Sequence, residues 1–306
     1  MSVELIYQLS ATLLTLGLLF LGFNAYGRFS SYDHDNELTE ADNPAVGWVT
    51  FGYMAALLIV LTKVLANEAD HGGDTLVMVY DLLELFIYGV LAIVLLKIAG
   101  IINDRFILSN CENKKEIVDD RNQGAAAAVL GSYVASALMI AGAIHGDARG
   151  DEPDAFFSGL QNDILLVLIY FVVGQILMIL FAKLYQRVCG LDVLKAIEAD
   201  YEVDGQKVGG NAAAGTALGL NMIAFGILLL GAGTTESSDT LAMVKDYAIF
   251  AAFGLFLLPL WQVFADHVML QSADLKKEIY EDRNLNAALI EGACVIGLAL
   301  VLFLVF

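Results

Sequence analysis

Long apolar stretches alternate with short polar ones along the whole chain. A bilayer core about 30 Å thick needs roughly 20 mostly apolar residues for each helical crossing. Eight windows of that kind occur: Leu5 to Gly27, Asn43 to Ala66, Leu76 to Ile101, Asn122 to Ile144, Asp163 to Arg187, Asn211 to Gly231, Leu241 to Ala265 and Asn284 to Phe306. The pattern therefore predicts an all-α transmembrane protein that forms an eight-helix bundle.

The segment from Lys114 to Ala126 is repeated from Lys276 to Ala288. KKEIVDDRNQGAA and KKEIYEDRNLNAA agree at nine of thirteen positions, at an offset of 162. Two shorter matches, which begin at Thr75 and Asn43, follow at offsets of 165 and 168. Ordered matches at nearly one period indicate an internal repeat. We therefore expect one four-helix repeat over residues 1–150 and a second over residues 151–306, parallel because each holds an even number of spans.

The composition excludes an ordinary water-soluble domain. Hydrophobic residues make up 58% of the chain and charged residues 17%, whereas soluble domains have about 45–50% and about 25%. The formal net charge of −19 argues against nucleic acid as a partner, and the apolar spans imply membrane lipids. No Cys-x-x-Cys, Walker, G-x-S-x-G or H-E-x-x-H motif occurs, so we expect no cofactor, no metal and no enzymatic activity.

Lys and Arg are distributed unevenly between the two ends of the spans. Thirteen of the 16 fall at or between the ends that join spans one and two, three and four, five and six, or seven and eight. The other three, Lys63, Arg149 and Lys245, lie at the opposite ends. Loops rich in Lys and Arg stay in the cytoplasm. The odd-to-even loops should therefore be cytoplasmic, and both termini should lie outside.

Each even-numbered span is preceded by an asparagine: Asn43, Asn122, Asn211 and Asn284. Asparagine caps helices because its side-chain oxygen accepts a hydrogen bond from a free backbone N–H. In a second interpretation, the four helix N-termini converge and bind an anion or a lipid head group. Small residues at four-residue spacing, such as Gly215 and Gly219, favour close helix packing over a pore lined by glycine.

Ionisable residues inside the spans are few. Asp81 and Glu84 lie one turn apart near the outer end of the third span, and Lys245 with Asp246 occupies the matching part of the seventh. Lys63 lies at a similar depth in the second span. A charge within a span costs several kcal/mol on insertion scales. These residues therefore either form interfacial ion pairs or provide an entry site for a cation or proton.

Three further polar residues lie deeper in the spans. Glu291 is two turns into the last span, and its partner in the first repeat is Val129. It has no charged neighbour in the sequence, so we expect the carboxylates of the third span to matter more for function. Gln175 and Asn221 lie near the middles of the fifth and sixth spans, where they either form hydrogen bonds between helices or coordinate a solute.

The stretch GNAAAGTALGLNMIAFGILLLGA begins at Gly210, and segments that start with Asp-Arg-Asn begin at Asp120 and Asp282. These stretches resemble a bacterial membrane family known as domain of unknown function 350, in which Asn-x-Ala-Ala precedes glycine-rich apolar helices. The resemblance implies a double-length, multi-pass protein of the bacterial inner membrane, of unsettled activity. In such a membrane, the Lys and Arg pattern predicts that both termini are periplasmic. The resemblance also implies an occasional association with envelope-stress systems, and it supplies no catalytic residue.

Two functions from different classes follow. In the first, the bundle transports a small solute or ion past the candidate residues named above. In the second, it is a non-transporting scaffold or sensor whose cytoplasmic loops recruit a stress-response protein. The intramembrane carboxylates favour the first function, and the packing rich in alanine and glycine favours the second. Both are compatible with a homo-oligomer.

Overall fold

The computed structural model describes residues 3–66, 74–109, 114–144, 156–203, 205–233, 240–258 and 274–306. Helices dominate this part of the chain, and its sheet structure consists of one two-stranded hairpin. Lipid cannot hydrogen-bond to the backbone, and a helix satisfies its backbone groups within a single segment. The prediction of an all-α membrane protein is confirmed for these residues.

Seven helices in the described residues are long and apolar enough to cross a membrane. They are α1 (Val3–Phe29), α3 (Pro44–Ala66), α4 (Thr75–Ile102), α5 (Gln123–Ala143), α6 (Phe156–Cys189), α8 (Ala212–Gly233) and α12 (Leu285–Val305). A π-helical segment, η1 (Asn103–Ile107), continues α4. Each helix covers one of the predicted windows, so the chain is a multi-pass membrane protein. The largest difference is at α6, which begins at Phe156 rather than near Asp163.

The seventh expected window, Leu241 to Ala265, lies only partly within the described residues. Its first part forms α9 (Thr240–Ala252) and the π-helical segment η4 (Phe253–Leu257). Residues 259–265 lie outside the described part of the chain. The bundle of eight helices in two parallel repeats therefore stays a prediction.

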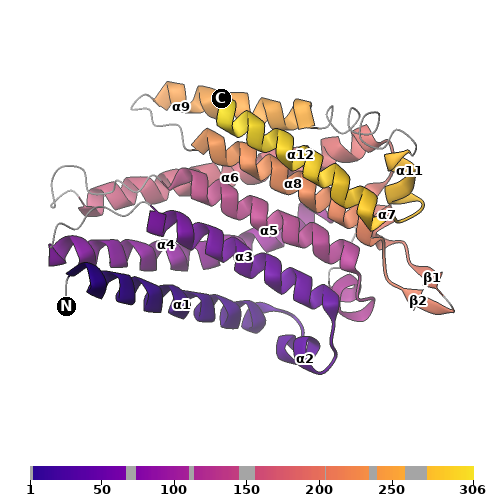
Figure 1. The fold of residues 1–306 in the computed structure, drawn as a ribbon, viewed down its shortest axis with the longest axis horizontal. Coiled ribbons are helices and arrows are strands. Elements are labelled where there is room, and N and C mark those ends of the chain that lie inside the picture. Colours follow the sequence, from indigo (N-terminus) through magenta and orange to yellow (C-terminus); the bar gives the residue numbers. More distant parts are fainter. Residues whose placement is uncertain are drawn as a thin grey trace.

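A short helix precedes each of α3, α5, α8 and α12. These short helices are α2 (His34–Thr39), η2 (Lys115–Asp119), α7 (Val193–Glu198) and α11 (Leu275–Tyr280). An antiparallel hairpin of β1 (Tyr201–Val203) and β2 (Gln206–Val208) lies between α7 and α8, and the hydrophobic pattern did not predict it. Figure 1 shows α2, α7, α11 and the hairpin at one end of the bundle. The described elements that directly precede α3, α8 and α12 thus lie at a single end of the bundle.

The long helices form two layers. In one layer α3, α5, α8 and α12 lie side by side in that order, and each packs against the next (Figure 1). Behind this row, α1 packs against α3 and α4, α6 packs against α5, and α9 packs against α8. The two edges of the row are therefore α3, next to the first helix of the chain, and α12, its last.

Glycine allows the helices of the row to approach each other closely. A Cβ atom at Gly131 of α5 would overlap the backbone of Gly219 in α8, and a Cβ at Gly52 of α3 would overlap Leu130 in α5. At the third junction, a Cβ at Gly292 of α12 would overlap the side chain of Leu220 in α8. Close backbone approach of this kind drives helix association in lipid. These glycines therefore pack between helices, which agrees with the packing interpretation and not with a glycine-lined pore.

We predict that Gly131→Ala destabilises the protein. The added methyl group would force α5 and α8 apart, and overpacking of a close contact costs about 1–3 kcal/mol. Thermal unfolding in detergent should therefore occur at a lower temperature. Gly17→Ala is the matched control, because a Cβ at Gly17 of α1 meets no atom within 4 Å. Equal melting temperatures for the two variants would contradict the close contact.

Candidate functional site

The four asparagines that precede α3, α5, α8 and α12 act as N-caps. The Oδ1 atoms of Asn43, Asn122 and Asn211 accept hydrogen bonds from backbone N–H groups two or three residues later, at 3.0, 3.0 and 3.1 Å. Asn284 accepts one from the N–H of Asn286 at 3.0 Å. The residue before each cap has a positive φ, which turns the chain into the helix: Asp42, Arg121, Gly210 and Arg283. The capping interpretation agrees with this geometry.

The amide nitrogen of the same side chains makes a second set of contacts. Nδ2 of Asn43 donates to the backbone oxygen of Ile117 at 3.0 Å, which lies in the next short helix, η2. Nδ2 of Asn122 donates to Ile197 O in α7 at 2.9 Å. Nδ2 of Asn211 donates to Ile279 O in α11 at 3.0 Å. Each of the first three caps is thereby bonded to the short helix of the following hairpin.

A carboxylate completes three of the four motifs. Nδ2 of Asn43, Asn122 and Asn284 also donates to a glutamate six residues earlier, at 2.9, 2.7 and 2.8 Å, and the acceptors are Glu37, Glu116 and Glu278. Burial raises the pKa of Glu116, while the hydrogen bond from Asn122 opposes that shift. The caps stand in a row and their polar atoms already have protein partners. This arrangement differs from four N-termini that converge on one anion.

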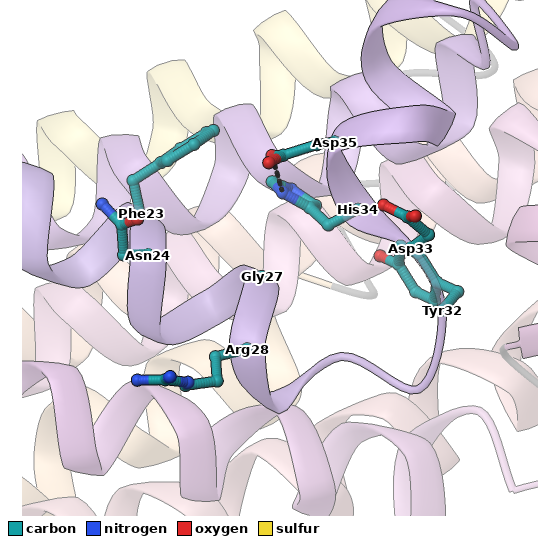
Figure 2. Close-up of a pocket in the computed structure, with 8 residues that line it drawn as sticks. All are labelled: Phe23, Asn24, Gly27, Arg28, Tyr32, Asp33, His34 and Asp35. Carbon is teal, nitrogen blue, oxygen red and sulfur yellow. Dashed lines mark ion pairs between the residues drawn. The ribbon is translucent and has the colours of Figure 1, made fainter.

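A pocket of about 410 Å³ lies between the end of α1 and the start of α2. Figure 2 shows the residues that line it: Phe23, Asn24, Gly27, Arg28, Tyr32, Asp33, His34 and Asp35. His34 is buried with 4% of its surface exposed, and its ring contacts the rings of Phe23 and Tyr26 edge to face. The sequence interpretation did not single out this histidine, because one histidine among aspartates has no motif.

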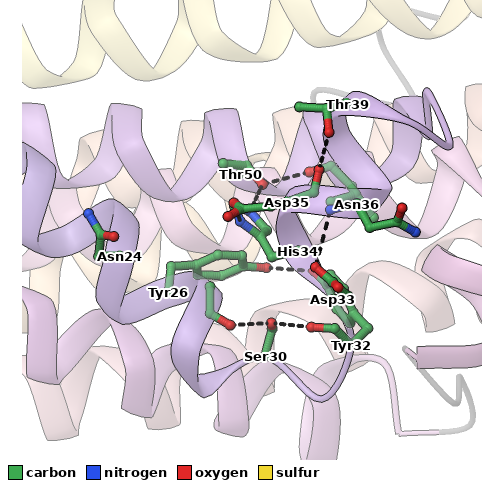
Figure 3. A network of polar contacts seen from close by, with 12 residues as sticks. Asn24, Tyr26, Ser30, Tyr32, Asp33, His34, Asp35, Asn36, Thr39 and Thr50 are labelled. Atoms are coloured by element: carbon green, nitrogen blue, oxygen red, sulfur yellow. Dashed lines mark hydrogen bonds and ion pairs between the residues drawn. The ribbon is translucent and has the colours of Figure 1, made fainter.

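The two ring nitrogens of His34 face different partners (Figure 3). Nε2 lies 2.9 Å from the hydroxyl of Thr50, which itself donates to Val46 O at 2.8 Å. Because that hydroxyl proton is already used, Nε2 carries the proton and donates to Thr50. Nδ1 is buried and lies 3.8 Å from a carboxylate oxygen of Asp35. Burial lowers the pKa of His34, and the charge of Asp35 opposes the shift.

The outer carboxylates of the third span are buried. Asp81 is 6% exposed and Glu84 is 5% exposed, both on α4, and Lys63 of the adjacent helix α3 is half-buried. Asp163 of α6 and Glu84 interact electrostatically with the buried hydroxyl of Tyr88. The structure thus adds Asp163 to the predicted group. Among the described residues, no three His, Cys, Asp or Glu side chains lie close enough together to hold a metal ion.

Lys245 and Asp246 lie elsewhere, on α9, which packs against α8. Lys245 is exposed, and Asp246 is half-buried and interacts electrostatically with Tyr170 of α6. The charged residues of α9 therefore match those of α4 only in their position along the repeat. The structure does not gather the charges of α4 and α9 into one site.

Glu291 has polar neighbours in the structure that are distant from it in the sequence. Its carboxylate is buried, with 2% of the residue exposed, and Oε1 accepts a hydrogen bond at 3.2 Å from Nδ2 of Asn221 in α8. Two buried tyrosine hydroxyls, of Tyr185 in α6 and Tyr280 in α11, interact with it electrostatically. The premise that Glu291 stands alone is wrong, because the packing of α12 on α8 supplies a partner from 70 residues away.

The two tyrosines contact each other where α6 meets α11. Their hydroxyl groups are 2.9 Å apart, and the Tyr280 hydroxyl also lies 3.5 Å from Sγ of Cys189. Burial raises the pKa of Tyr280, so its hydroxyl keeps its proton. One sequence signal points to this cluster. Tyr280 and Glu291 are polar where the first repeat has Val118 and Val129.

Gln175 forms a hydrogen bond between helices near the middle of α6. Its Nε2 donates to the hydroxyl of Ser136 in α5 at 2.8 Å, and both residues are buried. The oxygen of the same amide, Oε1, has no hydrogen-bond partner in the described residues, and neither has Oδ1 of Asn221. Each of these two amides therefore uses one atom to hold helices together and keeps a second, buried polar atom available.

The fold and these buried side chains define a helical, multi-pass membrane protein with polar and acidic groups inside its spans. The family model described as Domain of Unknown Function (DUF350) matches residues 1–144 and 159–306. The chain therefore belongs to this family, and the two matched segments are consistent with a tandem double copy of the domain. No curated protein and no solved structure matches the chain.

We predict that Asn122→Ala destabilises the protein by about 3 kcal/mol, because it removes a cap worth about 1 kcal/mol and leaves buried acceptors without a donor. Those acceptors are Ile197 O and the Glu116 carboxylate. Unfolding in detergent measures the effect. Asn24→Ala is the control, because the amide of Asn24 bonds only locally, to Phe20 O on an exposed face of α1. A loss no larger than in the control would refute the proposed double role of Asn122.

We predict that His34 makes the folded state less stable in mild acid. Its pKa is lowered in the folded protein, so below its ordinary value, about 6.5, the unfolded chain binds the proton more readily and the free energy of unfolding falls. His34→Gln should flatten the pH dependence of the melting temperature below that value. Asp35→Asn should steepen it, since this carboxylate favours the charged imidazole. An unchanged profile in His34→Gln would contradict the assignment.

Proposed function

We propose that the protein moves a proton or a small cation across the membrane, with Glu291 as the group that binds it. The observation that carries this proposal is a buried carboxylate, within a membrane-spanning helix, that accepts a hydrogen bond from a buried amide. An acidic side chain inside a span is costly and commonly marks an ion or proton pathway. Packing alone does not require Glu291, because the first repeat has valine at the equivalent position.

The tyrosine pair is the proposed route between Glu291 and the end of the bundle that carries the short helices. Tyr280 belongs to α11, which lies at that end, and its hydroxyl is within hydrogen-bond distance of the Tyr185 hydroxyl. Hydroxyl groups both donate and accept, so they can pass a proton along such a contact. This route supports entry or exit on the side that we expect to be cytoplasmic.

Polar groups beyond Glu291 support the rest of the route. Oδ1 of Asn221, Oε1 of Gln175 and the hydroxyl of Tyr247 are buried without a hydrogen-bond partner in the described residues. Buried polar atoms of this kind normally bind water or an ion. In this proposal they hold water between the helices of the second repeat, and Asp81 with Glu84 provides a separate acidic entry in the first repeat.

The proposed setting is the bacterial inner membrane, with both termini periplasmic. It rests on the Lys and Arg pattern and on the family resemblance. In Figure 1, α1 begins and α12 ends away from the short helices, which supports termini on one side. Lipids are the partners in this proposal, and no enzymatic step is part of it.

A second candidate function is a membrane scaffold that recruits a soluble protein of a stress response. The observation that favours it is the row of short helices at one end, each fixed to its membrane helix. Such a rigid, regular surface suits protein binding. This candidate needs no movement of ions through the bundle, so an ion-flux measurement separates it from the first.

We predict that Glu291→Gln abolishes proton uptake into proteoliposomes that contain a pH-sensitive dye and a potassium gradient set with valinomycin. The amide keeps the size of the side chain but cannot bind and release a proton. Glu281→Gln is the matched control, because Glu281 is exposed at the end of α11, outside the membrane-spanning helix. Wild-type protein without flux would favour the scaffold, and flux retained in Glu291→Gln but lost in Asp81→Asn with Glu84→Gln would move the site to the first repeat.

A further inference from the structure

The contacts that join neighbouring hairpins have the same register at every junction of the row. Counted from the capping asparagine, the ninth residue of one helix meets the eighth residue of the next. The three pairs are Gly52 with Leu130, Gly131 with Gly219, and Leu220 with Gly292. At least one member of each pair is glycine, so the helix backbones can approach.

The same register can be read on the two helices that end the row. The ninth residue after Asn284 is Ala293, which is exposed on α12. The eighth residue after Asn43 is Phe51, which is 66% exposed on α3. A small residue on one edge thus corresponds to a large one on the other, as Gly52 corresponds to Leu130 inside the row.

Other contact positions are also small and open at the two edges. Gly47, four residues after Asn43, corresponds to Gly215 of α8, where a Cβ would overlap the backbone of Gly124. Gly297, thirteen residues after Asn284, corresponds to Ala135 of α5, which is fully buried. A Cβ at Gly47 or at Gly297 meets no atom within 4 Å. Both edges therefore keep contact glycines that the chain itself leaves uncovered.

The hydrogen-bond chain between hairpins also stops at these edges. Three caps donate forward to the carbonyl of Ile117, Ile197 or Ile279. Nδ2 of Asn284, the last cap, donates to Glu278 of its own hairpin, and no forward bond from it is found in the described residues. The residue equivalent to the three isoleucines in the first short helix is Leu38, and no hydrogen bond to its carbonyl is found there either. A donor is thus left at one edge and an acceptor at the other.

We infer that α12 of one copy packs against α3 of a second copy, so that the row continues from chain to chain. Asn284 then donates to Leu38 O of the second copy, and Ala293 faces its Phe51. The inference does not depend on the proposed function. Figure 1 shows α3 and α12 on opposite sides of α5 and α8, which makes the contact head-to-tail. Such contacts build a ring or an open filament, depending on the rotation between copies.

A second copy fits these edges better than lipid does. Acyl chains offer no backbone to pack against Gly297. A second copy does, and it also places a backbone carbonyl next to the amide of Asn284, in the register already used three times within the chain. The inner edge positions are apolar or small, so the continued row buries no unpaired charge.

Disulfide crosslinking in native membranes tests the inference. One full-length variant carries Phe51→Cys and another carries Ala293→Cys, both with Cys111, Cys189 and Cys294 replaced by Ser. Co-expression followed by copper-phenanthroline oxidation should give a crosslinked dimer, because residues in this register bring their Cβ atoms within disulfide range. A single chain that carries both cysteines should give larger species.

The matched control uses Phe51→Cys with Leu304→Cys. Leu304 is 78% exposed on α12 but lies eleven residues beyond Ala293, about 16 Å further along the helix, out of reach of Phe51 in the inferred register. This pair should crosslink severalfold less. Equal yields for the two pairs, or no dimer for the first pair, would overturn the inference.

A second variant separates assembly from folding. Gly297→Leu places bulk where the single chain has open space, so the monomer should keep its melting temperature in detergent. The same change should abolish the crosslink between positions 51 and 293 in membranes. Asn284→Ala should lower that crosslink severalfold. An undiminished crosslink in Gly297→Leu would show that α12 does not meet α3 through this face.

Discussion

The organisation of the protein depends on one constraint: the free backbone groups at the start of a membrane helix need partners. At Asn43, Asn122 and Asn211 a single side chain satisfies a helix N–H with its oxygen and a carbonyl of the next hairpin with its nitrogen. Local capping and the order of the hairpins are therefore set by the same amide. Because each bond points forward to the next short helix, the hairpins line up in a row.

Close packing within the row follows from that register. Once the caps fix the helices at one level, the ninth residue of each helix faces the eighth of the next, and glycine at one of these positions lets the backbones meet. The row thereby becomes a dense layer with little room between its helices. Polar groups that need water or an ion are found instead where the second layer meets it, as with Gln175 of α6.

Hydropathy predicted the spans because each crossing must hide its backbone in a helix, and seven of the eight windows are long apolar helices. The capping role of the four asparagines could be predicted from local chemistry. The forward bonds could not, since Asn43 and Ile117 are 74 residues apart and their contact depends on tertiary order. The hairpin after α7 also escaped prediction, because its strands are only three residues long. The polar neighbours of Glu291 could not be predicted, because they depend on the packing of α12 on α8, which no local sequence pattern encodes.

The two repeats share their capping contacts but differ at buried positions of the same helices. Asn122 and Asn284 cap equivalent helices and bind equivalent glutamates, yet valine in the first repeat becomes Tyr280 and Glu291 in the second. The caps and the row tolerate this change because neither residue provides a capping contact. A duplicated unit of this kind can hold its fold in both copies while one copy gains a buried polar cluster. Positions at which the two repeats differ within the same scaffold therefore indicate chemistry that neither repeat reveals alone.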